Sequence, residues 1–151
     1  MLLELAGRSR ESLHGLELTR ALVEGRKRLL AERQGIDWPS LFRDDECEEI
    51  RVAIKNLKHA RWMYLRDTTR YSIFMSTEDE ESYAVLGLTD PIREVVGQVS
   101  MIFETAIFPL GESYVCDGLF SGVMAVGPNM RADYRELQSK IVKRGRFYKR
   151  P

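Results

Sequence analysis

Two long strands decide the fold class, and they are Val99-Ser-Met-Ile-Phe-Glu-Thr-Ala-Ile-Phe108 and Tyr114-Val-Cys-Asp-Gly-Leu-Phe120. The first run is apolar on both faces except at three positions, which is the pattern of a strand covered on both sides. The connection 109–113 contains Pro and Gly and is short enough for a hairpin. We therefore expect the two strands to pair antiparallel in the centre of a sheet.

A second hairpin is predicted upstream of this pair. Tyr71, Ile73 and Met75 alternate with polar residues, and Ser82 to Leu88 is a further apolar run. The four consecutive acids between the two runs, Glu78 to Glu81, then form the tip of the hairpin. Residues 61–66 fit either the end of a helix or a two-faced strand, and the pattern favours the strand.

Three longer helices and one short helix surround these strands in the sequence. Each longer helix shows apolar residues at spacings of three and four, which form one stripe along a helix. A short helix follows Pro91 and ends at Gly97. The stripes are Leu18, Leu22, Gly25 and Leu29 within 9–33, Cys47, Ile50, Ile54 and Leu57 within 45–58, and Met130, Tyr134, Leu137 and Ile141 in the last helix.

This order of elements predicts an α+β fold. We expect an antiparallel β-meander of about five strands, with two N-terminal helices and one C-terminal helix packed on one face. The 151 residues suffice for a single domain, 1–151, without a stabilising metal or disulfide. Its parts are a helical segment 1–58, a sheet segment 59–128 and a basic segment 129–151, with a hinge at Ile36-Asp-Trp-Pro-Ser40.

The net charge of zero conceals a strong asymmetry along the chain. Residues 1–35 carry a net charge of +2, residues 36–128 carry −8, and residues 129–151 carry +6. A basic terminal segment can bind a polyanion or an acidic patch on another protein. It can equally neutralise the acidic body of its own chain.

Several classes of protein are disfavoured by composition. The apolar runs are too short for a membrane span, and the N-terminus lacks the features of a secretory signal. Cys47 and Cys116 lack the spacing of a metal or disulfide motif, so we expect buried thiols, no metal, no cofactor and a cytoplasmic location.

One carboxylate pair is a candidate for chemistry. Asp117 precedes a glycine inside an apolar stretch, and Glu104 lies on the preceding strand of the same hairpin. Two close carboxylates can share a proton or hold a divalent ion. A turn or bulge at Asp117 explains the same residues without any chemistry.

Phe108-Pro-Leu-Gly-Glu-Ser-Tyr-Val-Cys-Asp-Gly-Leu119, continued by Gly127-Pro-Asn-Met-Arg131, resembles a tract of uncharacterised prokaryotic proteins. Those proteins have a Pro-containing turn, a strand ending in aromatic-x-x-Asp-Gly and a basic C-terminal helix. The resemblance covers about residues 108–131 and implies a prokaryotic cytosolic protein. It carries no assigned activity and no functional residue.

The leading functional hypothesis is a non-enzymatic binding module whose C-terminal segment binds nucleic acid. Basic side chains off the apolar stripe would contact phosphates, and aromatic side chains between them would stack on unpaired bases. A protein-interaction or regulatory subunit assembling through the first helix, as a homo-oligomer or with another chain, is the alternative. A small enzyme or metal-binding protein around Asp117 and Glu104 is the third. The candidate nucleic-acid-binding residues are Arg131, Arg135, Lys143, Arg144, Arg146, Phe147, Tyr148, Lys149 and Arg150.

Overall fold

The computed structural model describes Gly7 and residues 13–32, 48–76 and 78–151. The chain divides into two compact units, Met1–Arg51 and Val52–Pro151. Helix α2, Gly15–Ala31, belongs to the first unit, and the second unit contains all the strands. Among the helices that are described, none is long and apolar enough to cross a membrane.

Helix α2 confirms the first predicted helix over most of its length. Leu29 is buried and Leu18 and Leu22 are half-buried, as the predicted stripe requires. Gly15 is the first residue of the helix and has a φ of +54°. The predicted hinge at 36–40 and Cys47 lie outside the described residues.

Helix α4, Glu48–Lys55, corresponds to the second predicted helix but turns a different side inward. Ala53 is buried, whereas Ile50 of the predicted stripe is 46% exposed. The helix stops at Lys55 and the chain enters a strand at Lys58, so the predicted stripe up to Leu57 extends beyond the helix.

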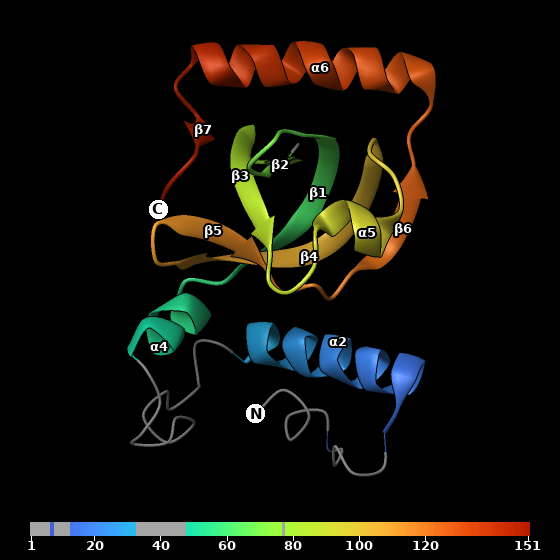
Figure 1. Ribbon diagram of the computed structural model, residues 1–151, viewed down its shortest axis with the longest axis vertical. Coiled ribbons are helices and arrows are strands. Elements are labelled where there is room, and N and C mark those ends of the chain that lie inside the picture. Colours follow the sequence, from blue (N-terminus) through green and yellow to red (C-terminus); the bar gives the residue numbers. More distant parts are fainter. Residues whose placement is uncertain (1–6, 8–12, 33–47, 77) are drawn as a thin grey trace. The chain divides into compact units, whose positions relative to one another are not determined.

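The second unit is built around a closed barrel (Figure 1). Its five strands are flanked by a short helix, a long helix and two further strands. In chain order the elements are β1 Lys58–Asp67, β2 Ser72–Ser76, β3 Glu81–Gly87, α5 Ile92–Val96, β4 Met101–Leu110, β5 Ser113–Cys116, β6 Ser121–Ala125, α6 Pro128–Lys143 and β7 Phe147–Tyr148.

The strand order corrects the expected simple meander. Strands β1, β2 and β3 do form an antiparallel meander, and β4 and β5 form the expected hairpin. However, β5 pairs parallel with β3, and β4 pairs antiparallel with β1, so the order β1-β2-β3-β5-β4 closes on itself. Sequence patterning located these five strands and their hairpin partners but could not specify the two pairings that close the barrel, because it reports which strand faces are buried and not which strand edges meet.

The barrel interior is filled mainly by aromatic side chains. Trp62, Tyr64, Phe74 and Phe103 are fully buried, and Phe74 and Phe103 meet edge to face with ring centroids 5.3 Å apart. Trp62 Nε1 donates a hydrogen bond of 3.0 Å to the Thr105 carbonyl, so its one polar atom is satisfied. Ile92 of α5 is buried in the same cluster.

Helix α6 covers part of the outer face of the barrel. Ile141 is buried there with Met63, Ile73 and Met75, and Tyr134 and Leu137 pack beside it. These three helix residues confirm the predicted stripe. Met130 does not belong to it, since its side chain is 46% exposed; in the same turn the exposed Arg131 donates from Nε to the Val126 carbonyl at 2.9 Å.

Two short strands were not predicted. Strand β6 lies in a stretch interrupted by glycines, and its pairing with β4 shifts register between Ile102 and Glu104. Strand β7 lies in the basic C-terminal tail, which is defined here as residues 144–151. Strand β7 pairs parallel with β3, and the Ser82 N–H donates a hydrogen bond to the Arg146 carbonyl at 3.0 Å.

Because β7 holds the tail on the barrel, the structure predicts that Phe147→Ala destabilises the second unit. Phe147 is half-buried against the cluster under α6, so its loss should lower the free energy of unfolding by about 1 to 3 kcal/mol. Urea unfolding followed by tryptophan fluorescence measures this. Lys149→Ala is the control and should change stability little, since Lys149 is exposed. Equal stability of Phe147→Ala and the parent protein would contradict the packing described.

Candidate functional site

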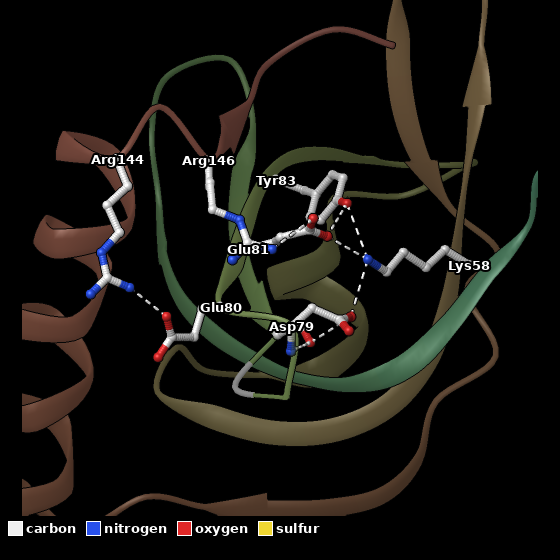
Figure 2. A network of polar contacts seen from close by, with 8 residues as sticks. Lys58, Asp79, Glu80, Glu81, Tyr83, Arg144 and Arg146 are labelled. Atoms are coloured by element: carbon white, nitrogen blue, oxygen red, sulfur yellow. Dashed lines mark hydrogen bonds and ion pairs between the residues drawn. The ribbon is translucent and has the colours of Figure 1, made fainter.

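The tail and the acidic β2–β3 turn form one network of ion pairs (Figure 2). Arg144 Nη1 lies 2.5 Å from Glu80 Oε2, and Arg146 Nη2 lies 3.2 Å from Glu81 Oε1. Strand β1 contributes Lys58 from the other side of Glu81. The acidic run of the sequence is therefore an internal partner of the tail.

Lys58 and Glu81 are the most enclosed charges of this network. Lys58 Nζ lies 2.5 Å from Glu81 Oε2 and 3.1 Å from Asp79 Oδ2, and the Tyr83 hydroxyl donates to Glu81 Oε2 at 2.7 Å. Burial by itself would raise the pKa of Glu81. The hydrogen bonds from Lys58, Tyr83 and Arg146 and the positive charge of Lys58 outweigh burial and lower this pKa to about 2.

The aromatic residues of the tail are packed into the barrel wall. The ring of Phe147 lies 6.4 Å from that of Tyr71, and the ring of Tyr148 lies 5.1 Å from that of Tyr83. Lys149 Nζ stands 5.6 Å from the Phe147 ring centroid. In these positions Phe147 and Tyr148 anchor the tail, and they could stack on a base only by leaving these contacts.

The structure separates the predicted nucleic-acid-binding residues into distinct groups. Arg144 and Arg146 pair with acids of the same chain, and Phe147 and Tyr148 anchor the tail. The remaining basic residues are all exposed. Arg131, Arg135 and Lys143 lie on α6, and Lys149 and Arg150 lie at the end of the tail.

Lys149 and Arg150 line a surface pocket with the β1–β2 loop and the β4–β5 turn. This cationic pocket has a volume of about 450 Å³, and Arg70, Tyr71 and Leu86 also line it. Its single carboxylate is that of Glu112, which lies 3.6 Å from Arg150 Nη1. Both partners are more than 70% exposed, so this ion pair contributes little and leaves the pocket positive.

A second pocket, the α5 pocket, adjoins the first and has a volume of about 560 Å³. The two share the loop residues 68–71 and Leu86, so they lie next to each other. The α5 pocket is also lined by Arg93 and by the carboxylates of Asp67, Asp90 and Glu94.

The predicted carboxylate pair is not assembled into a site. Asp117 Oδ1 accepts hydrogen bonds from the Thr105 hydroxyl at 2.8 Å and from the Leu119 N–H at 3.0 Å, as expected for a residue that orders a turn. Glu104 is the neighbour of Thr105 on β4, and consecutive strand residues point to opposite faces. Within the described ranges no group of three His, Cys, Asp or Glu residues could hold a metal ion.

The other sequence predictions near Asp117 concern Cys116. Its side chain is fully buried in the barrel interior, as expected for a core thiol, and its sulfur lies 3.3 Å from the Thr105 hydroxyl. Cys47, the second predicted core thiol, lies outside the described residues.

Sequence reasoning missed Arg70 and Arg93 as site residues. Each is an isolated arginine in a short connection or helix, with no motif around it. The pairing of β7 with β3 brings Lys149 and Arg150 beside Arg70, which is about 80 positions away in the chain.

Comparisons of the chain with protein-family models, curated proteins and solved structures found no match. The chemistry of the cationic pocket and of the α5 pocket is therefore the basis for a functional proposal.

The Glu81 network predicts a specific acid sensitivity. The pKa of Glu81 lies near 2 in the folded protein and at its usual 4.5 in the unfolded chain. The ionised carboxylate therefore adds its full share to the free energy of unfolding above about pH 5, and this share disappears as the pH falls toward 2. That contribution amounts to about 3 kcal/mol. Glu81→Gln should therefore flatten the decline in unfolding free energy between about pH 5 and pH 2.

Chemical denaturation at a series of pH values makes this measurement. Glu78→Gln, which removes an exposed carboxylate of the same acidic run, is the matched control and should keep the parent's decline. The same slope in Glu81→Gln and the parent protein would show that Glu81 is not held by these bonds.

Proposed function

We propose that the barrel unit binds single-stranded nucleic acid in the cationic pocket. Arg70, Lys149 and Arg150 contact the phosphates, and the neighbouring α5 pocket receives the bases. The observation that carries this proposal is the convergence of three exposed cations, from a loop and from the chain end, on one pocket with a single carboxylate. Nucleic acid, the partner expected from the sequence, is retained, and the phosphate contacts are assigned to Arg70 and to the last two cations of the tail.

The barrel architecture supports this location. OB-folds, which are five-stranded Greek-key barrels, bind oligonucleotides or oligosaccharides on strands 2 and 3 and on the loops that join strands 1–2 and 4–5. In this chain α6 packs on the outer side of β2 and β7 occupies part of one edge of β3, while the cationic pocket lies at those two loops. Architecture alone does not decide function, so the charge of the pocket is the stronger argument.

The two pockets also offer groups suited to unpaired bases. Tyr71 is half-buried beside the cationic pocket, and Leu86 is 37% exposed between the two pockets. Aromatic and apolar side chains next to cations favour single strands, since their bases are accessible for stacking. A duplex keeps its bases stacked on each other and would gain only the phosphate contacts.

The test is binding of a fluorescent single-stranded oligonucleotide, measured by anisotropy at several salt concentrations. The double variant Lys149→Gln, Arg150→Gln removes two phosphate contacts. It should weaken binding and reduce the slope of log affinity against log salt by about 1.4, the value for two contacts on a single strand. Circular dichroism should show that the variant remains folded.

Two matched double variants complete this design. Arg20→Gln with Lys27→Gln removes the same charge from exposed positions of α2 and should leave the slope unchanged. Arg131→Gln with Arg135→Gln asks whether the exposed face of α6 takes part, as the sequence suggested. No binding by the parent protein at low salt would overturn the proposal, and so would an unchanged slope in the tail variant.

A second candidate function is assembly with another chain through α2. This helix exposes Leu16 at 77% and leaves Leu18 and Leu22 half-buried, so apolar surface is available for a partner. A homo-oligomer is the simplest such assembly.

Assembly through α2 predicts that the thermal midpoint of the parent protein rises with protein concentration. Leu22→Ala should abolish that dependence, because it removes an apolar contact from the interface. Light scattering after size exclusion gives the mass directly. A monomeric mass with a midpoint independent of concentration would exclude self-assembly through this helix.

A further inference from the structure

The α5 pocket differs chemically from the cationic pocket beside it. Carboxylates, Arg70, Arg93 and the apolar residues Val85, Leu86 and Ile92 line it, and of these three apolar residues Leu86 is the exposed one, at 37%. Carboxylates repel phosphate groups, so a strand lying along the two pockets would keep its phosphates on the cationic side. What enters the α5 pocket must therefore be an uncharged part with apolar faces, as a nucleobase has.

Asp67 supplies a fixed acceptor to this pocket. Its Oδ1 accepts hydrogen bonds from the Tyr64 hydroxyl at 2.6 Å and from the Ser72 hydroxyl at 2.7 Å, which hold the carboxylate in place. Its Oδ2 is shielded from solvent and accepts no hydrogen bond from the described residues. A buried acceptor without a donor is costly, so a ligand that donates to it gains more than an exposed group would give.

Arg93 stands over this acceptor. Its Nη1 lies 4.0 Å from Asp67 Oδ2, which is beyond hydrogen-bond distance, and its side chain is 65% exposed. Asp67 and Arg93 both line the α5 pocket, and a long exposed side chain such as that of Arg93 can move aside at little cost. The arrangement pairs an open pocket of about 560 Å³, which is large enough for a nucleobase, with one oriented acceptor.

We infer that the α5 pocket receives a base that carries an exocyclic amino group, and that Asp67 Oδ2 accepts a hydrogen bond from this group. The inference rests on the proposed function and adds base preference to it. Carboxylates read the N4 amino group of cytosine in known nucleic-acid recognition. Uracil has a carbonyl oxygen at that position, and two acceptors facing each other repel.

The experiment compares deoxycytidine and deoxyuridine homopolymers of equal length, about 12 nucleotides, at neutral pH and low salt. The two bases have the same size and differ in the hydrogen-bonding groups of one edge. The parent protein should bind the cytosine strand about fivefold or more tightly, as expected for one good carboxylate contact.

Asp67→Asn then tests the assigned atom. The amide oxygen can still accept from Tyr64 and Ser72, while the amide nitrogen replaces Oδ2 and turns an acceptor into a donor. The preference for cytosine should disappear or reverse toward uracil. Asp133→Asn on α6, where the carboxylate is exposed, changes the charge equally and should keep the preference.

A second variant covers the case in which Asp67→Asn does not fold. Arg93→Gln leaves both hydroxyl bonds to Asp67 in place and removes the cation that faces Oδ2. It should retain or strengthen the cytosine preference, because the amino group no longer competes with the guanidinium.

The outcomes separate this inference from the proposed function. Equal binding of the two strands by the parent protein overturns the base preference and leaves the proposed function standing. A cytosine preference that survives in folded Asp67→Asn, or that is lost in Arg93→Gln, overturns the assignment to Asp67. Absence of binding to either strand overturns the proposed function and this inference together.

Discussion

The structure depends on the way one edge of β3 is shared between two strands. Strand β5 pairs with β3 from Val85 to Gly87, and β7 pairs with it at Ser82 and Tyr83. The short β5 would otherwise leave the first half of this edge open, which is a liability in a β-sheet protein. The chain end thereby becomes part of the barrel wall, and its last cations reach the β1–β2 loop.

Charge segregation in the sequence follows from this arrangement. The acidic turn before β3 and the basic residues around β7 come together when the two strands pair, so much of the opposite charge is satisfied inside one unit. Glu81 is the enclosed member, with side-chain exposure of 17%, and a carboxylate there requires the cations around it. The exposed pairs, such as Arg150 with Glu112, add little to stability, and their side chains can turn to a ligand.

The elements of the fold were readable from the sequence to different degrees. The two-faced strand around Trp62 and the stripe ending at Ile141 were predicted correctly, because apolar periodicity reports burial directly. The parallel pairing of β3 with β5 and the strand at Phe147 were not, since both depend on contacts between residues far apart in the sequence. The aromatic pair of the tail looked like a stacking platform, and the barrel uses it for packing.

The candidate site was less predictable than the fold. Lys149 and Arg150 were singled out because they end a basic run, which is a local signal. Arg70 and Asp67 gave no such signal, because their role depends on the Tyr64 and Ser72 hydroxyl groups beside Asp67 and on the chain end that β7 places beside Arg70. Isolated charged residues can be recognised as site residues only when the structure shows that they lie close together.

The tail is a fixed part of the barrel and not a basic arm extending into solvent. Backbone ¹⁵N relaxation of residues 146–149 measures this directly. The account predicts order parameters near 0.85, equal to those of β3, together with slow hydrogen exchange of the Ser82 N–H that donates to Arg146. Order parameters below about 0.6 with rapid exchange at Ser82 would contradict it.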